Sequence, residues 1–361
     1  MDSPTDQKNI MNLIYKITLL LFACLTIDAC IDPLKVDIQD SQQILVVEGG
    51  ISTLPGRHRI LLTKSDKYGS VLDGFIRKQT GATVWVRDEE GNQTFFEELE
   101  EGNYYTPPTF QALIGRKYTL LITLANGERY VSTPEQVLPA PPIDSLTVLF
   151  KRQPVLNGAV QETGIEIYAQ WKDPEDASNY YLWETEGIHI LNTQPSLYVG
   201  RDGQGNPVPA PKDCCERCYQ YEPDINTVIR IFKDNFTNGK NNAELAVYIP
   251  DDGKRFMEKY MAIVKQYSLT KEAFQFYDLL KNQLSIQGDI FDPPPATIRG
   301  NMINLDNPDE EVIGYFRASD VATDTIYILR DDLEEPKPIK QIFDDCRVFK
   351  GATTERPPFW N

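Results

Sequence analysis

The chain has 361 residues, with 53 acidic and 36 basic side chains and a formal net charge of -17. Lysines and arginines are scattered along it, so nucleic-acid binding, which needs local positive charge at the phosphates, is disfavoured. The length exceeds one ordinary domain of about 100 to 200 residues, so we expect two domains.

Residues 1–30 have the layout of a secretory signal peptide. Two lysines precede an apolar run at 17–25, which is shorter than the roughly 20 residues that a membrane-spanning helix needs. The segment 27–30, IDAC, resembles a bacterial lipobox, so we expect cleavage before Cys30 and lipidation of its thiol. Cys24 is a weaker alternative, because cleavage there would leave a hydrophobic new N-terminus. The mixed acidic and aliphatic residues 31–42 suit a tether.

Residues 43–137 have the spacing of short strands and turns that is typical of a β-sandwich. An apolar run at 44–47 predicts a buried strand that ends at a Gly49-Gly50 turn. Alternating apolar and polar residues on both sides of a Glu-Glu-Gly-Asn turn predict a hairpin. The other predicted strands include 59–63, 82–86 and 118–122.

Glycines and tyrosines in this domain follow a recurring pattern, GA-x-V-x-V-x-D-x-x-G, then G-x-Y, G-x-x-Y-x-L and G-x-x-Y. The stretch from about 43 to 133 therefore resembles transthyretin-like or carboxypeptidase-regulatory sandwiches. The glycines suit turns and the tyrosines suit a core edge, so the resemblance implies a scaffold and no site. The matching residues are Gly81, Ala82, Val84, Val86, Asp88, Gly91, Gly102, Tyr104, Gly115, Tyr118, Leu120, Gly127 and Tyr130.

A proline-rich linker at 138–142 separates this domain from a second β-rich domain at 143–361 with one or two helices. In the second domain, residues 165–171 alternate cleanly and predict a strand with Trp171 in the core. Residues 179–184 predict its hairpin partner.

A helix is predicted near 269–285, with Ser268 or Thr270 as the N-cap. Its apolar residues recur at helical spacing, which indicates core packing rather than a ligand site. They are Phe274, Tyr277, Leu280 and Leu284.

Four further cysteines, Cys214, Cys215, Cys218 and Cys346, are disulfide candidates in an exported protein. A vicinal bond would be strained, so we favour Cys346 paired with Cys214 or Cys215, and Cys218 with the other one. A zinc site of four cysteines is an alternative, although Cys346 stands apart from the other three. A redox pair at Cys215 and Cys218 lacks the expected strand-to-helix context.

Residue patterns for catalysis are missing. The two histidines, His58 and His189, occupy no zinc-protease motif, and the chain has no nucleophile-elbow or nucleotide-binding motif. We therefore predict no enzymatic activity, no cofactor and no metal site. One acidic group could hold a structural calcium ion, but we favour a solvated turn there. That group is Asp306, Asp309, Glu310 and Glu311.

Tyrosine pairs at 104–105 and 180–181 each predict one inward and one outward ring. An outward tyrosine could stack on a glycan or peptide. We favour ordinary core and rim positions.

The C-terminal part contains several distinctive short sequence motifs. With Cys30 and the N-terminal sandwich, they resemble a domain-of-unknown-function family, number 4249, of lipoproteins in Bacteroidota. The resemblance implies an outer-membrane lipoprotein that faces the cell surface and works beside a TonB-dependent outer-membrane receptor. It implies no catalytic or ligand residue. The motifs are Phe291-Asp292-Pro293-Pro294, Gly300-Asn301, Gly314-Tyr315-Phe316, Asp345-Cys346-Arg347 and Pro358-Phe359-Trp360.

The function expected from these features is binding. We expect an accessory lipoprotein of a TonB-dependent nutrient-uptake system, attached to the membrane through its lipid and taking a ligand that the sequence does not name. A structural or adhesive envelope protein is the alternative. A hydrolase, suggested only by the abundant carboxylates, is the third hypothesis.

Overall fold

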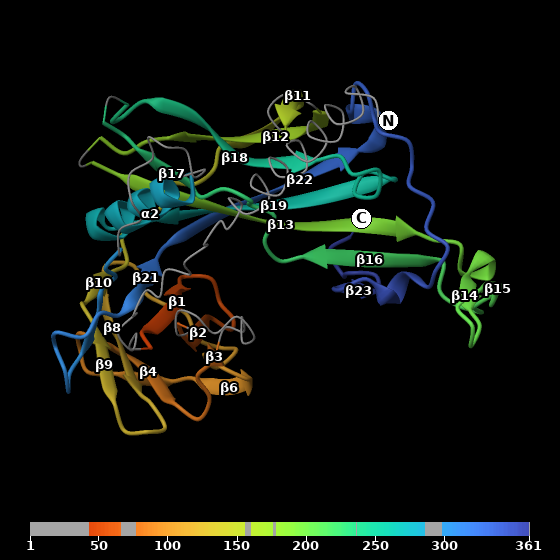
Figure 1. The fold of residues 1–361 in the computed structure, drawn as a ribbon. Coiled ribbons are helices and arrows are strands. Elements are labelled where there is room, and N and C mark those ends of the chain that lie inside the picture. Colours follow the sequence, from red (N-terminus) through yellow and green to blue (C-terminus); the bar gives the residue numbers. More distant parts are fainter. Residues whose placement is uncertain are drawn as a thin grey trace, which may run out of the picture. The chain divides into compact units, whose positions relative to one another are not determined.

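A computed structural model describes residues 43–65, 77–155, 160–175, 178–235, 237–285 and 298–360 (Figure 1). The predicted leader with Cys30, the tether at 31–42 and the motif at 291–294 lie outside these residues. The described part is mainly β, with several sheets and one α-helix, which confirms the predicted fold class.

Two six-stranded sheets contain the N-terminal strands and two strands from much later in the chain. The first sheet comprises β1 (Leu45–Ser52), β2 (Arg59–Lys64), β3 (Arg77–Lys78), β6 (Glu97–Glu100), β7 (Asn103–Tyr105) and β21 (Ile313–Ser319). The second comprises β4 (Thr83–Asp88), β5 (Gln93–Phe95), β8 (Lys117–Thr123), β9 (Arg129–Ser132), β10 (Glu135–Gln136) and β20 (Met302–Asn304). Their orders are β21-β1-β2-β7-β6, with β3 beside β2, and β20-β9-β8-β4-β5, with β10 beside β8.

The core between these sheets follows from the alternation of side chains along each strand. Val84 and Val86 of β4 are buried, as are Leu120 and Ile122 of β8, which confirms the predicted alternation. They share one apolar cluster with residues of β1 and β2 from the facing sheet. The buried β1 and β2 residues are Leu45, Val47, Ile51, Ile60 and Leu62.

Two strands from the predicted C-terminal unit, 143–361, complete these N-terminal sheets. β21 runs parallel to β1 and β20 antiparallel to β9, and in Figure 1 the blue β21 lies beside the red β1. Met302 and Phe316 belong to the same apolar cluster as the N-terminal strands. A local pattern could not reveal this, because parallel neighbours are joined by long crossover connections.

Gly49 and Gly50 lie inside β1, so the turn predicted there is wrong and the strand continues to Ser52. A Cβ on Gly49 would overlap the carbonyl oxygen of Arg59 in β2, and one on Gly50 the carbonyl oxygen of Arg317 in β21. Glycine is needed because a neighbouring backbone approaches β1 closely on each side.

The rest of the chain builds a second pair of sheets. The three-stranded sheet has the order β11-β12-β18, with β11 (Ser145–Val155), β12 (Val160–Lys172) and β18 (Asn241–Pro250). The facing six-stranded sheet comprises β13 (Tyr180–Asn192), β16 (Arg217–Glu222), β17 (Arg230–Lys233), β19 (Lys259–Ser268), β22 (Val321–Leu329) and β23 (Ala352–Thr353). Its order is β22-β19-β13-β16-β23, with β17 beside β13. A separate hairpin pairs β14 (Val199–Arg201) with β15 (Pro207–Pro209), and short 3₁₀ turns are at Pro195–Leu197, Arg330–Asp332 and Cys346–Val348.

The hairpin predicted between 165–171 and 179–184 does not form. β12 pairs with β11 and β18, whereas β13 pairs with β16, β17 and β19 in the facing sheet. The segment between them is therefore a crossover from one sheet to the other. Trp171 is in the core as predicted, at 1% exposure, and packs on Tyr181 and Trp183 across the sheets.

The helix α2 (Lys271–Leu284) lies within the predicted segment at 269–285, with Thr270 as the N-cap that accepts a hydrogen bond from Ala273. Tyr180 packs against Phe274 of this helix, and Tyr181 faces the core between the sheets. Both tyrosines are buried, so neither offers the outward ring considered for a glycan or peptide.

Candidate functional site

The four cysteines form two disulfides. Cys218 pairs with Cys346, with 5.8 Å between their Cα atoms, and Cys214 pairs with Cys215. The pairing that we favoured from the sequence is therefore wrong. Cys218 of β16 and Cys346 are both fully buried in a small apolar cluster with Leu191, which holds them together. All four thiols are used, so none remains for the alternative zinc site.

Asn301, from one of the distinctive C-terminal motifs, binds the backbone of β21. Its side-chain amide donates to the carbonyl oxygen of Phe316 at 2.8 Å, and its side-chain oxygen accepts from the Phe316 N–H at 2.9 Å. The adjacent Gly300 lies against Gly314, where a Cβ would overlap the Gly314 carbonyl oxygen. The motifs at 300–301 and 314–316 therefore serve the packing of β21.

The motifs at 345–347 and 358–360 hold the C-terminal segment in place. Asp345 accepts from the backbone and guanidinium of Arg347, and these hydrogen bonds hold the pKa of its carboxyl well below the usual range. Trp360 is buried against Tyr219 and packs in a small cluster with Met261. Their role is structural.

The acidic turn at 306–311 is also occupied by internal contacts. Asp306 pairs with Arg129 of β9 at 2.6 Å, and hydrogen bonds from Arg129 lower the pKa of its carboxyl. Glu310 accepts from the hydroxyl of Tyr130 at 3.0 Å and from Asn304 at 2.9 Å. These carboxylates hold the turn against β9, so this group is a poor calcium candidate.

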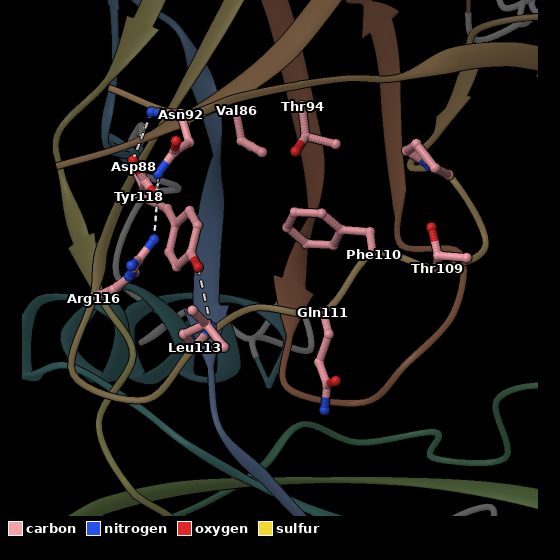
Figure 2. Close-up of a pocket in the computed structure, with 11 residues that line it drawn as sticks. Val86, Asp88, Asn92, Thr94, Thr109, Phe110, Gln111, Leu113, Arg116 and Tyr118 are labelled. Atoms are coloured by element: carbon pink, nitrogen blue, oxygen red, sulfur yellow. Dashed lines mark hydrogen bonds and ion pairs between the residues drawn. The ribbon is translucent and has the colours of Figure 1, made fainter. Parts of the chain in front are cut away.

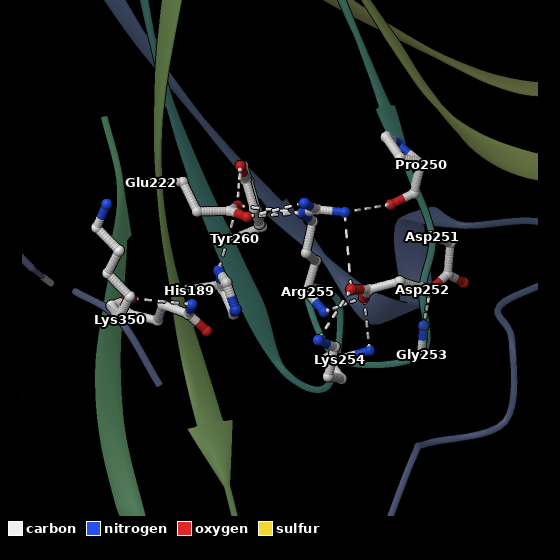
Figure 3. A network of polar contacts seen from close by, with 11 residues as sticks. His189, Glu222, Pro250, Asp251, Asp252, Gly253, Lys254, Arg255, Tyr260 and Lys350 are labelled. Atoms are coloured by element: carbon white, nitrogen blue, oxygen red, sulfur yellow. Dashed lines mark hydrogen bonds and ion pairs between the residues drawn. The ribbon is translucent and has the colours of Figure 1, made fainter. Parts of the chain in front are cut away.

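His189 lies inside the second pair of sheets, in the polar network of Figure 3. Its ring stacks on Tyr260, with centroids 5.7 Å apart, and its Nδ1 is 3.6 Å from an oxygen of Glu222. Burial lowers the pKa of His189 to about 4, and Glu222 offsets this only in part. His189 is therefore neutral at pH 7.

The charges beside His189 neutralise one another. The Arg255 guanidinium donates to both oxygens of Glu222 at 2.9–3.1 Å, and the Tyr260 hydroxyl donates to Glu222 at 3.0 Å. Figure 3 shows Arg255 between Glu222 and Asp252, and the Asp252 oxygen lies 3.7 Å away. The network joins β13 and β16 to β19 and the segment that leads into it.

A pocket of about 410 Å³ opens on the N-terminal sheets (Figure 2). The loop between β7 and β8 supplies Thr109, Phe110 and Gln111, and the β4–β5 hairpin supplies Asn92 and Thr94. Phe110 is partly buried against the core, and its ring lies among the labelled residues in Figure 2. The pocket therefore combines an aromatic face with hydroxyl and amide groups.

One wall of the pocket is held by paired charges. Arg116 donates to Asp88 and to Glu90, at 2.5 and 2.7 Å. Burial raises the pKa of Asp88, but hydrogen bonds from Asn92 and Arg116 outweigh it, so the net shift is downward. Because the guanidinium is neutralised, the wall does not select an anion. An aromatic face with neutral polar groups suits a glycan or a peptide.

Comparison with family models gives one match, over residues 31–325, to the domain of unknown function DUF4249. The match covers most of the chain. The protein belongs to the DUF4249 family. No curated protein matches its sequence.

In this DUF4249 chain, sequence reasoning placed no residue at the pocket. Val86, Asp88 and Tyr118 line it, but the sequence pattern marks them only as scaffold positions. Its aromatic face, Phe110, lies outside any regular strand, so no alternation marks it.

Two absences concern the part of the chain that the structure describes. There, no cluster of three or more histidine, cysteine or acidic side chains is placed to hold a metal ion. Within the same residues, no helix is both long enough and apolar enough to cross a bilayer.

Proposed function

We propose that this DUF4249 protein is an outer-membrane surface lipoprotein, anchored through Cys30, that serves as a binding or accessory component of a TonB-dependent nutrient-uptake system. The observation that carries the exported location is the buried Cys218–Cys346 disulfide. Disulfides persist in oxidising compartments and are rare in the cytosol.

Two sequence features support the lipid anchor. The leader ends in a lipobox-like IDAC segment, and the family match begins at residue 31, directly after Cys30. The acyl chains of a lipidated cysteine provide stable membrane attachment without a spanning helix. The TonB-dependent partner comes from the family resemblance alone.

The pocket beside Phe110 is the proposed ligand site. Replacing Thr109, which is exposed at the pocket, with Trp would fill it with a large side chain. In a deletion strain that has lost uptake of one nutrient, we expect Thr109→Trp to restore less than about a tenth of the wild-type rate. Thr133→Trp, on another exposed threonine, serves as the matched control and should restore uptake fully.

Co-purification tests the partner. Outer membranes solubilised in mild detergent should yield the tagged protein together with a TonB-dependent receptor, and a Cys30→Ser variant should yield much less of it. Repeated recovery of the wild-type protein without any receptor would contradict the accessory role. Wild-type nutrient uptake in the deletion strain would instead favour the structural or adhesive alternative.

A further inference from the structure

Two loops of the second pair of sheets meet at Asp173 and Asp234. Asp173 directly follows β12 in the three-stranded sheet, and Asp234 directly follows β17 in the facing sheet. The Asp173 N–H donates to the carbonyl of Lys240 at 2.9 Å, and the Asp234 N–H to that of Asn179 at 3.3 Å. The main chain therefore fixes the position of both aspartates.

Both aspartates are buried, at 1% and 2% exposure. One oxygen of Asp173 accepts a hydrogen bond from the Tyr181 hydroxyl at 2.7 Å. Its second oxygen and both oxygens of Asp234 have no hydrogen-bond partner in the described structure, and neither does the shielded hydroxyl oxygen of Thr237. Four oxygens are thus buried without satisfaction, which is strongly unfavourable for carboxylates unless something binds them.

Asp234 differs in this respect from Glu222 and Asp306. Glu222 has Arg255, and Asp306 has Arg129. Asp234 instead has the carboxylate of Asp173 as its neighbour. Two close, buried carboxylates need a proton or a cation between them.

We propose that Asp173, Asp234 and Thr237 form a binding site for a calcium ion. Calcium takes six to eight oxygen ligands in flexible geometry, whereas magnesium demands a near-ideal octahedron. The three side chains offer only oxygens, and two carboxylates balance a double positive charge. Backbone carbonyls and water would complete the ligand set.

This site would cross-link the two sheets. Asp173 belongs to the crossover that leads from β12 into β13, and Thr237 lies in the loop that leads from β17 into β18. A calcium ion held by both loops would therefore stabilise the packing around Trp171, which contacts Tyr181 beside the site. The inference does not depend on the proposed uptake function.

Calcium titration of the full-length chain in detergent, after removal of metals with a chelator, tests the site. We expect saturable uptake of one calcium ion with a dissociation constant of roughly 10⁻⁵–10⁻³ M, and a rise in the midpoint of thermal unfolding. Magnesium should bind at least about tenfold more weakly. Terbium luminescence sensitised through Trp171 should appear and be displaced by calcium.

Variants locate the ion. Asp234→Asn should weaken calcium binding at least about tenfold and remove the thermal shift, and Thr237→Val should weaken it about threefold. Asp309→Asn, the same change on the exposed acidic turn, should leave it unaltered. If Asp234→Asn does not fold, the wild-type titration and Thr237→Val decide. Absence of saturable binding up to about 10 mM calcium, or unchanged affinity in Asp234→Asn or Thr237→Val, would overturn the proposal and leave a shared proton as the explanation.

Discussion

Burial sets the charge of His189 more strongly than its neighbours do. The pKa of His189 falls from its ordinary value of 6.5 to about 4 because the ring is buried, although Glu222 lies beside it. When the pKa of a histidine is lower in the folded than in the unfolded state, the unfolded state binds the proton at a higher pH, so acid favours unfolding. Its contribution to stability is therefore complete above pH 6.5 and is lost as the pH falls towards 4.

A His189→Gln variant tests this linkage. Between pH 7 and pH 4 the free energy of unfolding of the wild type should fall by roughly 3 kcal/mol more than that of the variant, since Gln does not titrate. Denaturant unfolding of both proteins at several pH values measures the difference. Parallel pH curves would show that His189 is not held neutral in the fold.

Single residues also show where sequence reasoning ends. Trp171 was correctly placed in the core, because its neighbours alternate regularly. Phe110 has no such pattern around it, because it lies in a loop, and only the course of that loop in the fold places it at the pocket. Asp173 and Asp234 are far apart in sequence, and only the folded crossover loops bring them together.

Strand β21 depends on glycine at its contact with β1. Gly314 has a φ of +96°, and a Cβ there would overlap the carbonyl oxygen of Val47. We expect Gly314→Ala to lower the free energy of unfolding by roughly 2–4 kcal/mol, through backbone strain and loss of close pairing. Denaturant unfolding of the variant and the wild type would measure the loss.

Gly91 is the matched control for this change. It has nearly the same φ, +92°, but a Cβ there meets nothing within 4 Å. Gly91→Ala should therefore lose only about 1–2 kcal/mol, the cost of the left-handed conformation alone. Equal losses in the two variants would contradict a steric role for Gly314.

Elements were predicted better than their pairing. Alternation identified β4 and β8, and the helical spacing identified α2, because each pattern reflects burial of one face. The predicted core position of Leu284 is wrong, because this side chain at the end of α2 is 69% exposed. The same alternation fits a hairpin partner or a strand in the facing sheet, so β12 and β13 were paired wrongly. The sequence of Gly49-Gly50 predicts a turn, because close approach of neighbouring strands leaves no local signal.

Across the whole molecule, one disulfide constrains far more chain than the other. Cys218 and Cys346 are separated by 128 residues, whereas Cys214 and Cys215 are adjacent. Because a cross-link stabilises by limiting the unfolded chain, the Cys218→Ser/Cys346→Ser variant should lose about 3–5 kcal/mol of unfolding free energy. The Cys214→Ser/Cys215→Ser variant should lose less than about 1 kcal/mol. Denaturant unfolding of the two double variants decides, and a larger loss in the second would contradict this reasoning.

The proposed lipid anchor of the molecule depends on the chemistry at Cys30. Mass spectrometry of the N-terminal peptide from the native protein tests it most directly. We expect a mature chain that begins at Cys30 and carries acyl chains on its sulfur. An unmodified thiol at Cys30, or a retained leader, would contradict the lipid anchor and the proposed attachment to the outer membrane.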